Sequence, residues 1–232
     1  MKVVEIFKSI EGEGVRAGRP CTFIRLYGCN LHCSYCDSRY ACEKDQFCVG
    51  QPYKEMSINE IMEQVHKNIC GLVTITGGEP TIHEDFHQLM STLIFNGYQV
   101  NVETNGSTDL RDYIYSITNI ERTVSSEGDS FFTMDIKCPS SGEEDKMNLE
   151  NLKYLRKNDV IKFVVGNEKD LKFVKDILSV YLSIKAQIFI SPVFGEIDNV
   201  DIVNWILDNK MNKVRFQVQL HKIVWDPEMR GV

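Results

Sequence analysis

The chain has 232 residues, of which 43% are hydrophobic and 25% charged, a composition ordinary for a globular protein. Its 26 Lys and Arg against 33 Asp and Glu residues give a net charge of −7, which argues against a nucleic-acid-binding surface. The first apolar run is too short for a signal peptide, and no stretch approaches the roughly 18 apolar residues of a membrane helix. We therefore expect a cytoplasmic protein of one domain, residues 1–232, with no nucleic-acid or membrane partner.

Short runs of β-branched and aromatic residues recur along the chain and predict strands. Several are apolar almost throughout, as expected for strands that are buried on both faces. The runs lie at 3–7, 22–27, 72–76, 98–104, 131–136, 160–165, 187–191 and 214–219.

Helical patterns separate many of these runs. Ser57 and Glu60 form a capping-box signature before residues 58–68. Apolar residues at spacings of three to four predict further helices at 148–158, 168–182 and 199–209. Strand–helix alternation predicts βαβ units and a mainly parallel sheet, either open and doubly wound or curled into a barrel. Residues 37–56 are predicted to be an insertion loop.

The eight cysteines of the chain are unevenly distributed, with Cys21, Cys29, Cys33 and Cys36 close together. Such local spacing, without an export signal, favours a metal or redox site over a disulfide framework. The spacing Cys29-x-x-x-Cys33-x-x-Cys36 places three thiolates where they can wrap one face of a [4Fe–4S] cubane. Three ligands leave one iron open, and an open position is typical of a catalytic metal site.

Two plainer interpretations of the cysteines were weighed. A structural zinc knuckle would need a fourth ligand such as His32, Cys42 or Cys48. Buried free thiols are the expectation for Cys21 and Cys70, which lie in or beside apolar runs. Cys42 and Cys48 fall in the predicted insertion loop, where we expect free thiols rather than a second metal site.

A glycine-rich turn follows the predicted strand at 72–76. In Gly77-Gly78-Glu79-Pro80 the two glycines permit close approach of a ligand, and Glu79 offers a carboxylate at the carboxyl end of a strand. This turn and the cysteine motif, with Tyr35 before its last cysteine, together resemble the radical S-adenosylmethionine (SAM) superfamily. The resemblance implies that SAM chelates the open iron of a [4Fe–4S] cluster and is cleaved to a 5′-deoxyadenosyl radical, which abstracts hydrogen from a substrate.

Longer segments carry a narrower resemblance. IFKSIEGEGVRAGRPCTFIRLYGCNLHCSYCDS at 6–38, ETNGS at 103–107, DIKCPSSGE at 135–143, QVQLHKIVW at 217–225 and the final RGV resemble the 7-carboxy-7-deazaguanine synthase family. The family implies an incomplete parallel (β/α) barrel, usually as a homodimer. It also implies conversion of 6-carboxy-5,6,7,8-tetrahydropterin to 7-carboxy-7-deazaguanine with loss of ammonia, in queuosine biosynthesis. A flavodoxin or ferredoxin type of low-potential electron donor is expected.

The same resemblance implies the residues that bind substrate. Arg25 is the candidate for the substrate carboxylate, because its planar fork suits bidentate pairing. An arginine in a strand is otherwise usually exposed or salt-bridged. The remaining expected substrate contacts are Ile10, Glu11, Gly12 and Thr104.

The cofactor contacts are likewise implied by position, and they follow the carboxyl ends of predicted strands, where parallel α/β folds build their sites. At Asp135 and Ile136 the chain departs from the Ser-Pro of many relatives. The expected SAM-binding residues are Tyr35, Cys36, Asp37, Gly77, Gly78, Glu79, Gly106, Asp135, Ile136, Lys137, Ser191, Pro192, Val193 and Phe194.

Ser38 is expected to hold part of a Mg²⁺ ion, since relatives place Ser or Thr there. A hydroxyl alone is a poor ligand, but Mg²⁺ prefers oxygen donors and keeps several waters, so substrate oxygens would complete the site. Without the resemblance, Ser38 reads as a serine that caps a turn.

Two rival functions remain at this level. A glycyl-radical activating enzyme would share the cysteine motif and the glycine turn but not the substrate pocket. An iron–sulfur electron carrier or zinc-binding interaction module would need a fully ligated metal.

Overall fold

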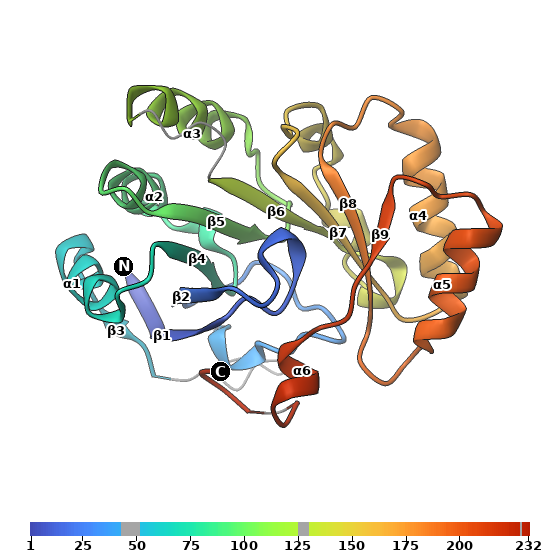
Figure 1. Cartoon of the computed structure of the whole chain (residues 1–232), viewed down its shortest axis with the longest axis horizontal. Coiled ribbons are helices and arrows are strands. Elements are labelled where there is room, and N and C mark those ends of the chain that lie inside the picture. The colour runs from blue at the N-terminus through green and yellow to red at the C-terminus, as the bar shows by residue number, and fades with distance from the viewer. Residues whose placement is uncertain (43–51, 125–129, 228) are drawn as a thin grey trace.

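The computed structural model describes residues 1–42, 52–124, 130–227 and 229–232. Its centre is a curved sheet with the strand order β3-β1-β2-β4-β5-β6-β7-β8-β9, and Figure 1 shows the helices α1 to α5 outside this curve. Strands β1 and β2 are antiparallel, as are β1 and β3, and every pairing from β2 to β9 is parallel. The sheet does not close on itself, so the prediction of an incomplete parallel barrel is confirmed.

Each predicted strand is present, although some of the ends differ. The strands are β1 (Lys2–Ile10), β2 (Pro20–Leu26), β3 (Lys54–Glu55), β4 (Leu72–Gly77), β5 (Gln99–Thr104), β6 (Phe131–Ile136), β7 (Val160–Val165), β8 (Gln187–Pro192) and β9 (Val214–Phe216). The two-residue β3 gave no sequence signal. β9 ends earlier than predicted, because the side chain of Gln217 turns toward the barrel interior and accepts from the Gly14 amide at 2.7 Å.

The helices are α1 (Ile58–Asn68), α2 (Phe86–Phe95), α3 (Arg111–Val124), α4 (Glu168–Val180), α5 (Asn199–Asp208) and α6 (His221–Val224). The Ser57 capping box of α1 is confirmed. Helices α2 and α3 were missed, although α2 buries apolar residues at helical spacing from Phe86 to Ile94. None of the described helices is long and apolar enough to cross a membrane.

The prediction of a helix at 148–158 was wrong. The structure has only a short 3₁₀ helix, η6 (Leu149–Lys153), in this segment. The side chain of Asn151 is fully buried and donates to the carbonyls of Gly106 and Thr108, at 3.1 and 2.8 Å. The segment therefore holds the loop that follows β5 through side-chain hydrogen bonds. These bonds go to another part of the chain and do not support a helix at 148–158.

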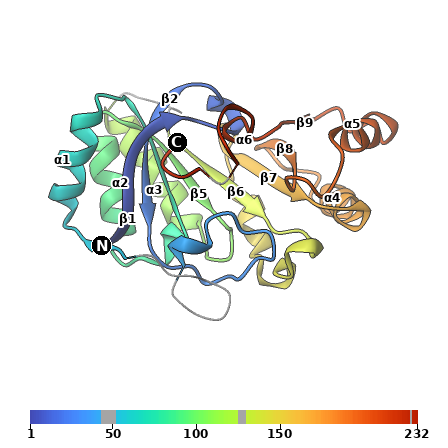
Figure 2. The ribbon, with the colours of Figure 1, turned by 90° about the horizontal axis from the view of Figure 1, so that it is seen from below.

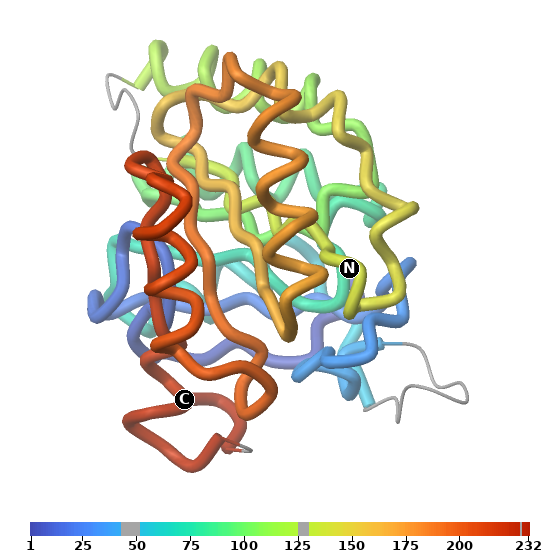
Figure 3. The backbone as a smooth tube through the Cα atoms, turned by 90° about the vertical axis from the view of Figure 1, so that its right-hand side faces the viewer, coloured from blue at the N-terminus to red at the C-terminus, as the bar shows by residue number. Residues whose placement is uncertain are grey.

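Different parts of the chain cover the two ends of the sheet. Figure 3 shows α4 and α5 side by side on the face that covers β7, β8 and β9. Figure 2 shows the last segment of the chain returning from β9 to lie beside β1, and the Leu220 amide there donates to the Gly12 carbonyl at 2.9 Å. The C-terminal segment thus covers the gap between the first and last strands.

Candidate active site

A cavity of about 640 Å³ opens inside the curve of the sheet at the carboxyl ends of the parallel strands. Its size is within the range of about 300–1,000 Å³ that is usual for ligand pockets. Most of the predicted site residues line it, namely Ile10, Glu11, Gly12, Arg25, Cys29, Cys33, Tyr35, Cys36, Asp37, Ser38, Gly77, Gly78, Thr104, Asp135, Lys137, Val193 and Phe194. Segments from both halves of the chain therefore meet in one space.

The cysteine loop between β2 and η2 (Arg39–Ala41) is held at both ends. The Gly28 amide donates to the Ala41 carbonyl at 2.7 Å, which closes the loop on itself. The Ser34 amide donates to the Ser141 carbonyl at 3.0 Å, and the Ser34 hydroxyl to the Ser140 carbonyl at 2.6 Å. These bonds tie the loop to η4 (Pro139–Ser141), which follows β6. The backbone that carries the three thiols is therefore held in place by residues that lie outside the cysteine motif.

The glycines of the turn after β4 press against this cysteine loop. A Cβ atom on Gly78 would lie 2.0 Å from the Gly28 carbonyl oxygen and 2.9 Å from Cys29 Cβ. The next amide, of Glu79, donates to the same Gly28 carbonyl at 2.8 Å. Gly78 is thus required for the close approach of two backbones, in addition to any contact with a ligand.

Glu79 lies behind the turn and does not line the cavity. It is fully buried, and its carboxylate accepts from the Thr104 hydroxyl at 2.7 Å and the Asn105 amide at 2.6 Å. It also accepts from the Thr81 amide and hydroxyl. Burial raises the pKa of Glu79, and these hydrogen bonds oppose the rise. Asn105, held in this way, reaches Cys29 Sγ at 3.9 Å, so Glu79 acts on the cysteine loop through its neighbours.

The thiols themselves have unlike environments. A hydrogen bond with Cys42 lowers the pKa of Cys29 and lowers that of Cys36 to about 7, whereas burial raises the pKa of Cys33 to about 12. No group of His, Cys, Asp or Glu side chains within the described ranges is close enough for a single metal ion. The thiolates of a cubane bind separate irons and so stand farther apart. The donor set, three free thiols on one cavity wall, fits such a cluster.

Arg25 points from β2 into the cavity beside the loop. Its Nε donates to Glu5 Oε1 at 2.8 Å, and its Nη1 lies 3.3 Å from Ser38 Oγ. Its guanidinium carbon also lies 5.5 Å from the centre of the Tyr40 ring. Among the hydrogen bonds of the described residues none uses Nη2. Glu5 therefore orients the guanidinium and leaves part of its fork for an incoming carboxylate.

Glu11 also lines the cavity and is 2% exposed. Its carboxyl group accepts from the Thr74 hydroxyl. Burial, together with the nearby charge of Glu103, raises the pKa of Glu11 to about 7. The group is thus able to exchange a proton near neutral pH, as a general acid or base must.

A chain of charges crosses the floor of the cavity. Lys162 lies 3.0 Å from Glu13 and 3.6 Å from Asp135, and Asp135 accepts from Lys137 at 2.9 Å. Burial opposes ionisation of Asp135, but the two lysines more than offset it and hold its pKa below the usual value. Asp135 Oδ1 is buried and has no hydrogen-bond partner in the described structure. The residue lines the cavity, and the acceptor capacity of this oxygen is unused.

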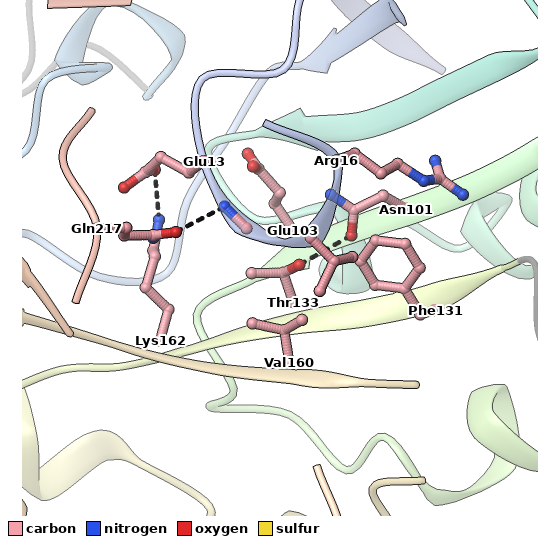
Figure 4. A pocket seen from close by; sticks show the side chains of 11 residues that line it. Glu13, Arg16, Asn101, Glu103, Phe131, Thr133, Val160, Lys162 and Gln217 are labelled. Carbon is pink, nitrogen blue, oxygen red and sulfur yellow. Dashed lines mark hydrogen bonds and ion pairs between the residues drawn. The ribbon is translucent and has the colours of Figure 1, made fainter. Parts of the chain in front are cut away.

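Figure 4 shows a second, small void, which shares Glu13, Glu103, Thr133 and Lys162 with the lining of the main cavity. The void is about 10 Å³, enough for roughly one water molecule. Figure 4 also shows the Thr133 hydroxyl directed at Asn101, to which it donates at 3.0 Å. Polar side chains and the apolar Phe131 and Val160 thus line this void together.

Five of the predicted residues do not line the cavity: Glu79, Gly106, Ile136, Ser191 and Pro192. Ser191 is fully buried, donates to Glu13 at 3.3 Å and accepts from Gln217 at 3.0 Å, so it supports the floor. The Gly106 carbonyl accepts from Asn151, which holds the loop after β5.

The cavity also contains residues that were not assigned from sequence. Those with titratable side chains include Glu13, Cys42, Glu103, Lys162, His221 and Lys222. A lysine inside the apolar run at 160–165 was a usable signal, because buried lysines are rare without a partner. His221 gave no such signal: a Cβ atom on Gly12 would lie 2.2 Å from its Nδ1, a contact that only the fold creates.

Comparisons with known proteins agree with this geometry. The model of the radical SAM superfamily matches residues 23–167, which is more than half of the chain. The chain is 44% identical to 7-carboxy-7-deazaguanine synthase of Clostridium acetobutylicum, over 100% of this chain and 99% of that protein. It is 35% identical to the synthase of Koribacter versatilis over the whole of both chains. Among solved structures, QueE from Escherichia coli has the same fold, with a TM-score of 0.70 and 22% identity over 94% of this chain and 93% of that one.

An incomplete parallel barrel with three thiols at its mouth defines the class: this is a radical SAM enzyme. Within this superfamily, the full-length identities of 44% and 35% to two synthases show the family. The chain belongs to the 7-carboxy-7-deazaguanine synthase family.

Proposed function

We propose that this chain converts 6-carboxy-5,6,7,8-tetrahydropterin to 7-carboxy-7-deazaguanine with loss of ammonia. The observation that carries the proposal is one cavity that three free thiols and Arg25 line together. The thiols supply the donors for a cluster, and Arg25 supplies the charge complement of a substrate carboxylate. The reaction is inferred from family membership, and the role of each residue is inferred from its place in this cavity.

Cys29, Cys33 and Cys36 would hold a [4Fe–4S] cluster and leave one iron for SAM. When bound, the cluster and SAM supply a carbon-centred radical that takes hydrogen from the substrate. The chain's own residues position SAM. Tyr35 lies between the cysteines, and its ring reaches across to β7, where its hydroxyl donates to the Val164 carbonyl at 3.4 Å.

Asp135 is the proposed acceptor for a hydroxyl or N–H donor of SAM. Its Oδ2 is held by Lys137 and Lys162, its Oδ1 has no hydrogen-bond partner among the described residues, and the residue lines the cavity. A fixed, ionised acceptor loses little entropy when a ligand binds, so it contributes more than a mobile side chain would. Val193 and Phe194, after β8, add apolar contact on the same side.

The substrate would lie between Arg25 and the turn that contains Gly12. Arg25 pairs with its carboxylate, and the backbone of Ile10, Glu11 and Gly12 offers hydrogen bonds to the heterocycle. His221 packs against Gly12, and burial lowers its pKa, so its ring is neutral near pH 7 and can accept as well as donate. Glu11 and His221 are the groups placed to move protons during the loss of ammonia.

Ser38 is proposed to contribute to a Mg²⁺ site that the substrate completes. Its hydroxyl donates to Asp37 Oδ1 at 3.0 Å, so a carboxylate stands beside it. The guanidinium of Arg25 is also near, 3.3 Å away, and a cation there needs the negative charge of the substrate. We therefore expect the ion to bind only together with substrate.

Two partners complete the proposal. A low-potential donor of the flavodoxin or ferredoxin type would reduce the cluster, and the chain would act as a homodimer.

Binding measurements on the anaerobically reconstituted protein test the substrate assignment. With SAM present, the carboxypterin should bind more tightly, by roughly tenfold or more, than the same tetrahydropterin without its carboxylate, because the Arg25 donors that Glu5 does not use would otherwise lack a charged partner. Equal affinity for the two pterins, or no binding of either, would contradict the proposal and favour an activating enzyme that acts on a protein.

A further inference from the structure

A short segment after β6 holds the cysteine loop on both sides of Cys33. The amide of His32, the residue before this cysteine, donates to Glu143 Oε1 at 2.9 Å. The amide of Ser34, the residue after it, donates to the Ser141 carbonyl at 3.0 Å. The backbone that carries the Cys33 thiol is therefore placed by the segment that begins with η4.

This segment is itself held by a carboxylate that stands outside the cavity. Asp170, in the first turn of α4, is 0% exposed and does not line the cavity. Its Oδ1 accepts from the Ser140 amide at 2.9 Å, and its Oδ2 accepts from the Ser140 hydroxyl. Its Oδ2 also accepts from the amide of Gly166, after β7, at 2.7 Å. One buried carboxylate thus joins the loops that follow β6 and β7 to the start of α4.

Ser140 is the residue that connects Asp170 to the cysteine loop. Its amide and hydroxyl are bound to Asp170, and its carbonyl accepts from the Ser34 hydroxyl at 2.6 Å. Its packing is tight, since a Cβ atom on Gly166 would lie 3.3 Å from the Ser140 hydroxyl oxygen. A displacement of Ser140 would therefore be passed to the residue that follows Cys33.

We propose that Asp170 is a positioning residue of the iron–sulfur site, which acts through Ser140 and Ser34 to hold Cys33 where it binds iron. The inference rests on the proposed function, since it needs a cluster on the motif cysteines. Groups that orient metal ligands from behind contribute to metal affinity, because they fix the ligand geometry before the metal binds. A carboxylate suits this role, since it accepts from three donors at once and its hydrogen bonds are charge-assisted.

The test is the rate at which a chelator removes iron from the anaerobically reconstituted protein, in the unsubstituted chain and in Asp170→Asn. The matched control is Asp159→Asn. Asp159 is also 0% exposed and also accepts from a backbone amide, that of Phe132 at 3.0 Å. It precedes β7, however, and so lies at the opposite end of this strand from Gly166. The melting temperature of each iron-free protein measures the effect of each substitution on the fold.

We expect iron loss from Asp170→Asn to be faster on the order of tenfold, because an amide has one acceptor oxygen and cannot satisfy all three donors. Asp159→Asn removes the charged partner of Arg156 and should lower the melting temperature, but its rate of iron loss should match the unsubstituted chain. Ser140→Ala, which removes only the hydroxyl bond, should give a smaller increase and serves if Asp170→Asn does not fold.

A double-mutant cycle tests the route from Asp170 to the loop. Ser34→Ala should also speed iron loss, because it removes the hydroxyl bond to the Ser140 carbonyl. If Asp170 acts through this bond, the double variant should lose iron more slowly than the product of the two single effects predicts. The same cycle is open to Ser140→Ala with Ser34→Ala.

Two results would overturn the inference. The first is a rate of iron loss from folded Asp170→Asn equal to that from Asp159→Asn, which would make the role of Asp170 one of general stability. The second is a double variant whose effect is the full product of the single effects. Failure of the unsubstituted chain to assemble any four-iron cluster would instead contradict the proposed function, so the two failures are distinguishable.

Discussion

The cysteine wall and the charged floor of the cavity are built in different ways. The wall is set by backbone, as in the bond of the Gly28 amide to the Ala41 carbonyl and the contact of Gly78 with Gly28. The floor is set by side-chain charge, as in the pairs of Lys162 with Glu13 and Asp135. A motif cysteine is therefore replaceable without moving the backbone around it, whereas a substitution on the floor leaves a buried charge unpaired. The predictions below test this difference.

The largest effect is expected for Cys33→Ala. Two thiolates cannot hold a stable cubane, so iron content should fall and reductive SAM cleavage should be lost. Because the wall is held by backbone, the circular dichroism spectrum and the melting temperature of the iron-free protein should change little. Full iron retention with normal SAM cleavage would refute the ligand assignment.

Arg25→Gln should weaken carboxypterin binding by about 2–5 kcal/mol, since it removes a partly buried charge-assisted pair. SAM affinity and iron content should stay near those of the unsubstituted chain. Isothermal titration calorimetry with each ligand measures the change in carboxypterin affinity and the change in SAM affinity separately. Equal losses for both would instead indicate a general disturbance of β2, and Glu5→Gln, which removes only the orienting partner of Arg25, serves as the comparison.

Glu11→Gln should make stability less dependent on pH. The folded-state pKa of Glu11 is raised from 4.5 to about 7, so the folded state keeps its proton where the unfolded state loses it. Its contribution to stability is full below about pH 4.5 and is lost as the pH rises through about 7. The Gln variant, which can still accept from Thr74, should gain on the order of 1–3 kcal/mol over the unsubstituted chain at pH 8 relative to pH 5.

Urea unfolding at the two pH values measures this difference. Parallel pH profiles for the two proteins would argue against a proton-exchanging Glu11. The same measurement on Thr74→Val, which removes a hydrogen bond that lowers the pKa of Glu11, should show a pH dependence at least as large as that of the unsubstituted chain.

Asp135→Asn should weaken SAM binding by about 1–2 kcal/mol, because a neutral amide oxygen is a weaker acceptor than the ionised Oδ1. The variant also leaves Lys137 and Lys162 without their shared carboxylate, so its melting temperature should fall as well. SAM affinity unchanged in a folded Asp135→Asn protein would remove Asp135 from the cofactor site.

The smallest effect is expected at Ser38. Ser38→Ala, or chelation of Mg²⁺, should slow carboxypterin turnover severalfold while SAM cleavage without substrate continues, and Ser38→Thr should be tolerated. Turnover that is indifferent to divalent cations would exclude the Mg²⁺ site and leave the cluster assignment intact.

The sequence predicted the sheet well, because strands buried on both faces have a nearly continuous apolar pattern, as in Val160–Val165. It failed at 148–158, where the bonds of Asn151 to a distant loop outweigh a helical spacing. The linear motif gave Cys29, Cys33 and Cys36, since local spacing alone defines them.

Contacts between residues that are far apart in the chain could not be predicted from the sequence. His221 meets Gly12 across most of the chain, and Lys162 meets Glu13 between β7 and the loop after β1. Cys42 is a free thiol, as expected, but nothing in the local spacing indicated that it would be buried in the lining of the cavity. Cys48 lies outside the described residues.

Product analysis of an anaerobic reaction tests the central claim most directly. The reconstituted protein is incubated with SAM, a low-potential reductant, Mg²⁺ and 6-carboxy-5,6,7,8-tetrahydropterin, and pterin, deazaguanine and ammonia are measured together. The account predicts 7-carboxy-7-deazaguanine and ammonia in equal amounts, with both lost in Cys33→Ala and strongly reduced in Arg25→Gln. Cleavage of SAM with the carboxypterin left unchanged would contradict it.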